Sequence, residues 1–174
     1  ANHNASGVGT LLELARLWQQ EELDARRSVL LVAWGGVALD QELATDFIED
    51  ASNFRFLITP TMNGRVTPWM ILQLDYAGTG GDTLLVDSNS QGRVTETLVE
   101  TAAEVQVPVE FVTDAGVDGE LVADQIPGIY LQWSDAEVPT PDQDVFARIS
   151  ADKLQNYGET VTLLLTKLVR LSEF

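Results

Sequence analysis

Apolar runs of strand length alternate with helical segments along this chain, and this alternation limits its possible folds more than any other feature. Residues 28–34 (SVLLVAW) form a continuous apolar run that stops at two glycines, as expected of a strand buried on both faces. Further strand-like runs occupy residues 54–58, 69–75, 83–87, 107–112 and 129–133. Strands separated by helices indicate an α/β fold with a layered sheet.

Four segments carry apolar residues at helical spacing. The first begins near Ser6, with Ser6 or Asn4 placed to cap it, and its expected inward residues are Val8, Leu11, Leu12, Ala15 and Trp18. The other predicted helices lie at residues 42–50, 94–102 and 150–172. The strands at 69–75 and 83–87 are expected to be neighbours joined by a glycine-rich turn, and Pro108 favours a strand start or a sheet edge.

Length and composition are those of one globular domain. The chain has 174 residues, of which 45% are hydrophobic and 21% charged, so we expect a single domain over residues 1–174. Lys and Arg total 10 against 27 Asp and Glu, which gives a net charge of 10 − 27 = −17. Such a surface repels phosphate backbones and anionic lipids, so neither nucleic acid nor a membrane surface is an expected partner. No apolar run is long enough to insert into a membrane.

The rare residue types restrict the chemistry further. The chain has no Cys and one His, which excludes disulfides, thiolate metal sites and any active site rich in histidine. Its first residue is Ala rather than Met, so we expect a piece of a longer protein.

Five segments, taken in order, carry a family resemblance. They are residues 1–7 (ANHNASG), 29–39 with AWGG at the strand end, 72–75 (LQLD), 126–131 (IPGIYL) and 139–158, which begins PTPD and ends KLQNYG. Together they resemble the bacterial di-zinc aminopeptidase family, which is related to glutaminyl cyclase and the protease-like domain of the transferrin receptor. The resemblance implies a three-layer, mostly parallel mixed sheet flanked by helices, with the N-terminal part of the family domain missing.

The same resemblance indicates that the metal and catalytic residues are largely lost. His3 stands at the position of the metal-bridging Asp, Val37 at that of the general-base Glu, and Ala38 at that of the adjacent ligand Glu. Pro139 stands where the last ligand His belongs, and only Asp75 keeps its ligand identity. Asp118 lies near a Ser-Asp-His segment of the family, but the local match is poor. We therefore expect no catalytic residue and no bound cofactor.

Several features have both a structural and a functional interpretation. His3 and Asp75 could together bind one metal ion, or serve as structural residues. The acidic stretches at residues 40–50 and 135–144 are expected to be solvated surface rather than calcium or acid/base sites. Residues 78–81 (GTGG) lack the Lys and the following helix of a phosphate loop, which favours a tight turn. The tryptophans at strand ends could line a vestigial cleft or pack in the core; they are Trp34, Trp69 and Trp133.

Two functions remain open at this point. The favoured one is a non-catalytic peptidase-like domain with a binding or structural role in a larger protein. The alternative is a zinc-dependent aminopeptidase that removes N-terminal residues from peptides. Its partner would be a protein or a peptide, and an open sheet edge left by the missing strands could instead produce a homo-oligomer or be covered by residues 54–66. The resemblance favours a secreted or extracytoplasmic location.

Overall fold

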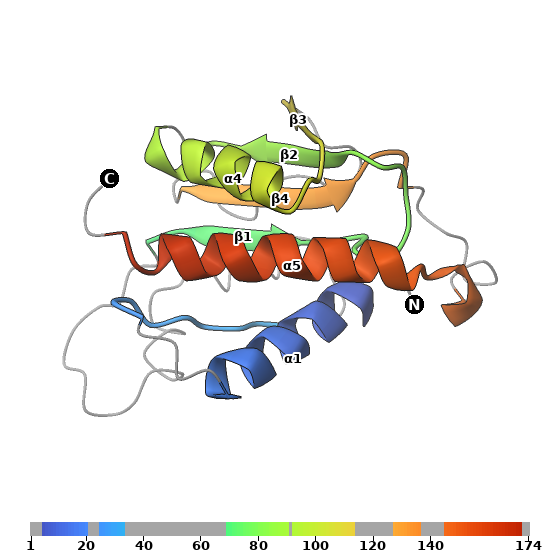
Figure 1. Cartoon of the computed structure of the whole chain (residues 1–174), viewed down its shortest axis with the longest axis horizontal. Coiled ribbons are helices and arrows are strands. Elements are labelled where there is room, and N and C mark those ends of the chain that lie inside the picture. The colour runs from blue at the N-terminus through green and yellow to red at the C-terminus, as the bar shows by residue number, and fades with distance from the viewer. Residues whose placement is uncertain are drawn as a thin grey trace, which may run out of the picture.

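The described part of the chain folds as four strands and three α-helices. The computed structural model describes residues 5–20, 25–33, 69–90, 92–113, 127–136 and 145–171. In chain order the elements are α1 (Ala5–Gln20), β1 (Ile71–Leu74), β2 (Leu84–Ser88), α4 (Arg93–Glu104), β3 (Val109–Val112), β4 (Gly128–Trp133), the 3-10 helix η1 (Phe146–Arg148) and α5 (Ala151–Leu168) (Figure 1). The predicted helix at 42–50 and the predicted strand at 54–58 lie outside the described residues.

The strands form one mixed sheet in the order β1-β4-β2-β3. β1 pairs in parallel with β4, and β2 pairs in parallel with β3, whereas β2 and β4 are antiparallel. This confirms the predicted α/β class with a mixed, mostly parallel sheet flanked by helices. The expectation that β1 and β2 are neighbours is wrong, because β4 lies between them. The intervening turn spans two strand spacings, about 10 Å.

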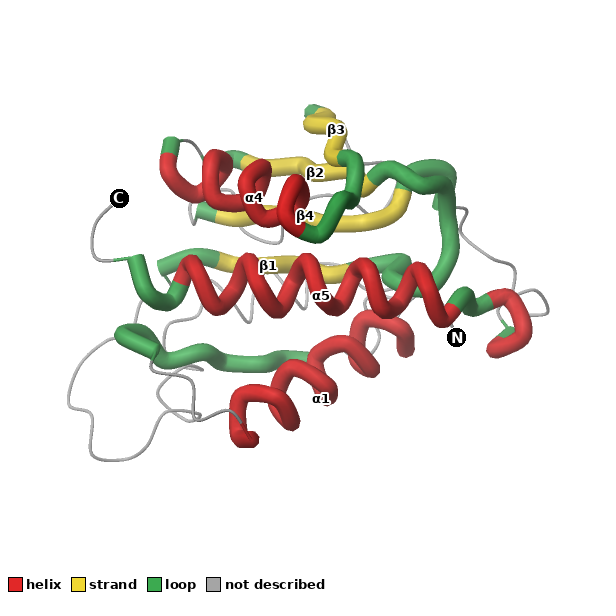
Figure 2. The backbone as a smooth tube through the Cα atoms, in the orientation of Figure 1, coloured by secondary structure: helices red, strands yellow, loops and turns green. Residues whose placement is uncertain are grey.

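The core lies between one face of the sheet and the helices α4 and α5 (Figure 2). Leu84 and Val86 of β2 stand opposite Trp133 and Leu131 of β4, so these four buried side chains share the core face. Each helix adds a buried stripe, which comprises Val94, Leu98 and Ala102 on α4 and Tyr157, Val161, Leu164 and Leu168 on α5. Burying each such Leu or Val contributes about 1.5–3 kcal/mol.

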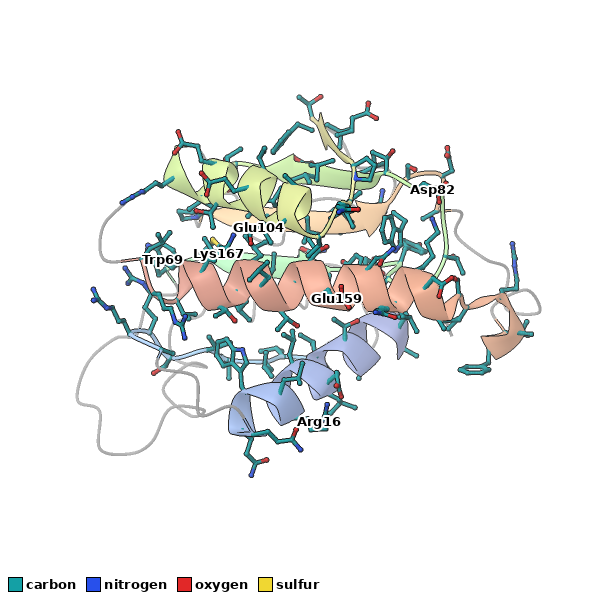
Figure 3. All side chains as sticks on the ribbon, viewed as in Figure 1. Arg16, Trp69, Asp82, Glu104, Glu159 and Lys167 are labelled. Carbon is teal, nitrogen blue, oxygen red and sulfur yellow. The ribbon has the colours of Figure 1, made fainter. Side chains whose placement is uncertain are left out.

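Polar contacts near both ends of α5 fix its position. The side chain of Ser150 accepts a hydrogen bond from the Lys153 backbone N–H at 3.3 Å, which caps the N-terminus of α5. Near the other end, the Lys167 ammonium lies 2.6 Å from the Glu104 carboxylate of α4 (Figure 3). This ion pair is partly exposed, so it orients the two helices more than it stabilises them.

Helix α1 forms where the sequence predicts it, but it buries a different face. The buried residues are Ser6, Gly7, Thr10 and Leu14, whereas Leu12, which was expected to point inward, is 68% exposed. The small residues explain the difference, because a Cβ atom on Gly7 would lie 3.0 Å from the carbonyl oxygen of Leu74 in β1. Close approach of the helix to the end of β1 therefore selects small side chains rather than the largest apolar ones.

The predicted buried strand at residues 28–34 is wrong over its described part. Residues 28–33 are irregular, and Leu30 and Leu31 are 41% and 37% exposed. The preceding backbone N–H of Arg26 donates to the carbonyl oxygen of Val169, beyond α5, at 3.2 Å. Arg27 lies with its guanidinium 4.4 Å from the ring centroid of Trp69. A β-prone run becomes a strand only when its backbone pairs with another strand.

The strand predictions at residues 69–75, 83–87, 107–112 and 129–133 are confirmed to within two residues at each end. β3 begins directly after Pro108 and lies at the edge of the described sheet, as the proline indicated. Within the described ranges, no helix is both long and apolar enough to cross a membrane.

Candidate functional site

The candidate site lies at the carboxyl ends of β1 and β4, where loops leave parallel strands. Asp75 is the first residue after β1, and its backbone N–H donates to the carbonyl oxygen of Leu131 in β4 at 3.1 Å. The same N–H also lies 3.2 Å from the hydroxyl oxygen of Tyr157 in α5. Two strands and a helix thus fix the backbone of Asp75.

Both oxygens of the Asp75 carboxylate lie near groups that can donate a hydrogen bond. Oδ1 accepts a hydrogen bond from the backbone N–H of Tyr76 at 2.9 Å, and the hydroxyl of Tyr130 lies 3.5 Å from Oδ2. Tyr76 is buried and has a φ of 43°, a left-handed conformation that is rare for a bulky residue. The chain therefore turns sharply at this point, so that the carboxylate folds back over its own backbone.

A polar strip runs along the sheet face opposite the core. Tyr130 stands opposite Gln73 of β1 in the register, and Gln132 lies two residues further along β4, so all three share one face with Asp75. Tyr130 and Gln132 are buried, and the Tyr130 hydroxyl donates to Oε1 of Gln132 at 3.0 Å. The strip ends at the carboxylate, which makes Asp75 part of a hydrogen-bonded network.

The side chain of Tyr157 extends from α5 to the sheet on the other side of Asp75. It is completely buried, and its hydroxyl donates to the carbonyl oxygen of Leu131 at 2.7 Å. Desolvation by burial raises the pKa of Tyr157 well above its ordinary value of 10.0, and the negative charge of Asp75 raises it further. The hydrogen bond from the Asp75 backbone acts in the opposite direction. The phenol is therefore a permanent neutral donor at physiological pH.

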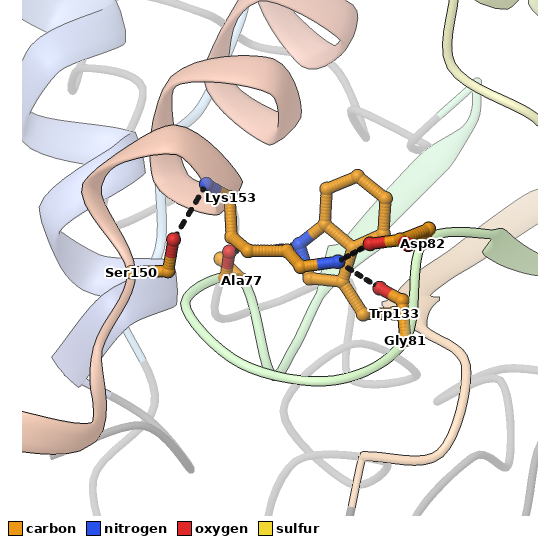
Figure 4. A network of polar contacts seen from close by, with 6 residues as sticks. All are labelled: Ala77, Gly81, Asp82, Trp133, Ser150 and Lys153. Atoms are coloured by element: carbon orange, nitrogen blue, oxygen red, sulfur yellow. Dashed lines mark hydrogen bonds and ion pairs between the residues drawn. The ribbon is translucent and has the colours of Figure 1, made fainter.

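The loops beside the site are held by a second polar cluster, the Lys153 cluster. The Lys153 ammonium donates to the carbonyl oxygen of Gly81 and pairs with Asp82 at 2.6 Å (Figure 4). It also lies 4.7 Å from the ring centroid of Trp133, whose indole N–H donates to the carbonyl oxygen of Ala77 at 3.0 Å. The cluster fastens the turn after β1 to the end of β4 and the start of α5.

Residues 78–81 lie in the turn between β1 and β2, as expected, but these strands are not neighbours because β4 lies between them. The glycines of this turn pack against the backbone that leaves β4, where Gly81 N–H donates to the carbonyl oxygen of Ser134 at 2.5 Å. Gly80 has a φ of 134°, and a Cβ atom there would lie 2.6 Å from the same carbonyl oxygen. The turn leads into β2 rather than into a helix, so it does not cradle a phosphate as a P-loop does.

Of the sequence-derived site positions, the structure describes Asp75 alone. His3, Val37, Ala38, Pro139 and the weakly matched Asp118 lie outside the described residues, as do Trp34 and most of both acidic stretches. Position 7, at the end of the segment that resembles the family's bridging-ligand motif, lies beside Leu74 and therefore next to Asp75. In the described structure, Asp75 of one motif segment therefore lies close to Gly7, at the end of another motif segment.

The donor set in the described part does not suit a zinc centre. Among the described residues, no group of three or more His, Cys, Asp or Glu side chains is placed to hold a metal ion. Zinc in a catalytic site needs at least about three protein ligands. Asp75 alone can supply one.

Of the three tryptophans at strand ends, the structure describes Trp69 and Trp133, and both pack in or against the core. Trp133 is 2% exposed and belongs to the core cluster, so core packing is its role. Trp69 is half-buried at the start of β1 beneath Arg27.

Three polar residues of this region were not predicted from the sequence: Tyr130, Gln132 and Tyr157. A signal for the first two exists, because polar residues at alternating positions within otherwise apolar strands share one face. Gln73 and Asp75 show the same alternation in β1. Tyr157 has no comparable signal, since a buried tyrosine at helical spacing is equally consistent with plain core packing.

Comparison with solved structures identifies the fold. The zinc aminopeptidase BSAP from Bacillus subtilis superposes with a TM-score of 0.72 at 20% identity, covering 99% of this chain and 43% of that protein. The LapA aminopeptidase from Legionella pneumophila gives 0.73 at 15% identity, covering 99% and 47%. Nicastrin, a component of gamma-secretase, gives 0.67 at 13% identity, covering 97% and 37%.

Sequence comparison adds nothing to this result. No family model matches the chain, and no match was found among curated proteins. The chain spans less than half the length of each of the three structural neighbours. At these identities the likeness concerns the fold alone, and it shows that this chain has the α/β fold of the zinc aminopeptidases and nicastrin.

Proposed function

We propose that this chain is a non-catalytic peptidase-like domain that serves a binding or structural role in a larger protein. The observation that carries the proposal is the state of Asp75. It is the one position of the resemblance that keeps the family's ligand residue, and its two carboxylate oxygens face the Tyr76 N–H and the Tyr130 hydroxyl. A carboxylate held in this way acts as a structural acceptor at the end of β1.

The other residues of the resemblance support the same interpretation. Val37 and Ala38 offer no donor atom in place of two Glu residues, and Pro139 offers none in place of a His. A neutral imidazole at His3 cannot bridge two cations as a carboxylate does. One retained ligand out of about five cannot hold two zinc ions in a catalytic geometry.

The fold itself is compatible with either role. It occurs in two zinc aminopeptidases and also in a component of gamma-secretase. The alternative of a metal-dependent aminopeptidase is favoured only by the first two likenesses, and a shared fold does not establish a shared activity. On the family resemblance we also propose a location outside the cytoplasm. Self-association through the sheet edge left by the missing strands is a further prediction.

The test is elemental analysis combined with a turnover assay on one preparation of the full-length protein. We expect no stoichiometric zinc and no hydrolysis of amino-acid anilides when zinc, cobalt or manganese is added. Val37→Glu alone should restore nothing, because a general base, worth about 10²- to 10⁴-fold in rate, has no metal-bound water to act on. About one or more zinc per chain, together with turnover that a chelator abolishes, would establish the peptidase alternative.

Asp75→Asn provides the matched variant. If the carboxylate is structural, the variant changes only stability, and its zinc content equals that of the unmodified protein. If Asp75 ligates a catalytic metal, the variant loses zinc and turnover together.

A further inference from the structure

The outer side of β3 has a backbone that no described residue pairs with. β3 is the last strand of the described sheet, and its strand neighbour there is β2. The Leu84 N–H donates to the carbonyl oxygen of Pro108 at 2.8 Å, so the backbone groups of alternate residues, Pro108, Glu110 and Val112, face β2. The N–H and C=O groups of Val109 and Phe111 therefore point outward.

Side chains of β3 differ between the two faces of the sheet. Phe111 stands opposite Val86 on the core face, yet it is 46% exposed. Val99, which lies on α4 above that face, is 47% exposed. Glu110 stands opposite Leu85 on the other face and is exposed. An added strand would thus meet apolar surface on one face and a carboxylate on the other.

The surrounding charge determines which kind of strand fits. Exposed carboxylates lie on α4 at Glu96 and Glu100, whereas Glu104 is paired with Lys167. The chain as a whole carries −17, so a second copy pairing at this edge would bring like charges together. A positively charged segment would instead be attracted to this edge.

We propose that the β3 edge binds an extended segment of a partner protein in which basic and apolar residues alternate. The segment adds as a fifth strand to the described sheet, its backbone bonding to Val109 and Phe111. Its apolar side chains lie beside Phe111, and its Lys or Arg side chains lie beside Glu110. The proposal deepens the binding role proposed above and rests on it, but its test uses neither zinc nor turnover, so the two can fail separately.

The test uses a capped hexapeptide of alternating lysine and valine with the full-length protein. We expect measurable binding by calorimetry and slowed amide exchange at Val109 and Phe111 when the peptide is present. The control peptide has the same sequence but carries N-methyl groups on alternate residues, which removes the donors that pair with the edge. Equal binding of the methylated peptide, or unchanged exchange at both amides, would overturn the proposal.

Protein variants separate strand addition from general charge attraction. Glu110→Lys should weaken binding at least about fivefold, because like charges then lie side by side across the new strand pair. Glu159→Lys changes the net charge equally but lies on α5, and it should leave affinity within about twofold. If Glu110→Lys fails to fold, Glu110→Gln replaces it in the experiment, and the expected loss of peptide affinity is smaller. Equal loss in the Glu110 and Glu159 variants, or a concentration-dependent dimer protecting the same amides without peptide, would contradict the proposal.

Discussion

The hydroxyl of Tyr157 donates a hydrogen bond to the carbonyl oxygen of Leu131 at 2.7 Å, so that α5 is fastened to β4, one of the two inner strands of the described sheet. The same oxygen of Tyr157 lies 3.2 Å from the backbone N–H of Asp75. One phenol therefore bridges a helix and the ends of two parallel strands.

Replacement of this phenol by Tyr157→Phe should lower the free energy of unfolding by about 1–2 kcal/mol. The loss is limited because Leu131 keeps its hydrogen bond from Asp75. Urea denaturation of both proteins measures the difference. Gln155→Ala on the exposed side of α5 is the control, and it should change stability by less than about 0.5 kcal/mol.

The raised pKa of Tyr157 predicts a loss of stability in alkali. In the unfolded chain this phenol ionises near its ordinary value of 10.0, whereas the folded protein retains the proton. The folded state then binds more protons, so stability is intact below pH 10 and falls as the pH rises above it. Denaturation between about pH 9 and 11 should show a steeper loss for the unmodified protein than for Tyr157→Phe. Parallel pH profiles would show that the phenol does not contribute.

The Gly80 conformation is expected to tolerate no side chain. Gly80→Ala should destabilise the protein by about 1–3 kcal/mol, because its φ of 134° is strained for Ala and its Cβ would lie against Ser134. Gly158→Ala is the matched control, since a Cβ atom there meets nothing within 4 Å on α5. That control should instead stabilise by about 0.5–1 kcal/mol. Thermal unfolding of both variants gives the comparison.

The stability that the Lys153 cluster contributes should depend more on the Lys153 ammonium itself than on its ion pair with Asp82. Lys153→Met removes the hydrogen bond to Gly81 and the contact with the Trp133 ring, at a cost of about 1–2 kcal/mol. Asp82→Asn should have a smaller effect, because the Asp82 side chain is 98% exposed. Thermal unfolding orders the two variants, and an Asp82 effect as large as that of Lys153 would contradict this account.

Salt should stabilise the whole domain. A net charge of −17 on one small domain makes the folded state self-repelling, so screening between about 10 and 300 mM salt should raise the Tm. A Tm that does not respond to salt over this range would indicate that the acidic groups are already compensated locally.

The candidate site shows where sequence reasoning succeeds and where it stops. Asp75 was identified because residues 72–75 (LQLD) resemble a family segment that ends in a ligand Asp, and such a motif is local in the sequence. Tyr157 lies 82 residues further along the chain, and only the packing of α5 onto the sheet brings its hydroxyl to the Asp75 backbone. Similarly, Tyr130 reaches Asp75 only through the register that pairs β1 with β4.

Local pattern determined the α/β class, the positions of β1, β2, β3 and β4, the helices α4 and α5, and the edge position of the strand after Pro108. Periodicity and proline act within a few residues, so a single sequence contains them completely. Strand order, the buried face of α1 and the irregular state of residues 28–33 were decided by tertiary structure. Each of these features depends on which distant backbone segment lies close enough to pair or pack. β4 lies between β1 and β2, and Leu74 lies against Gly7. A strand-prone run without a paired backbone stays irregular, whatever its side chains favour.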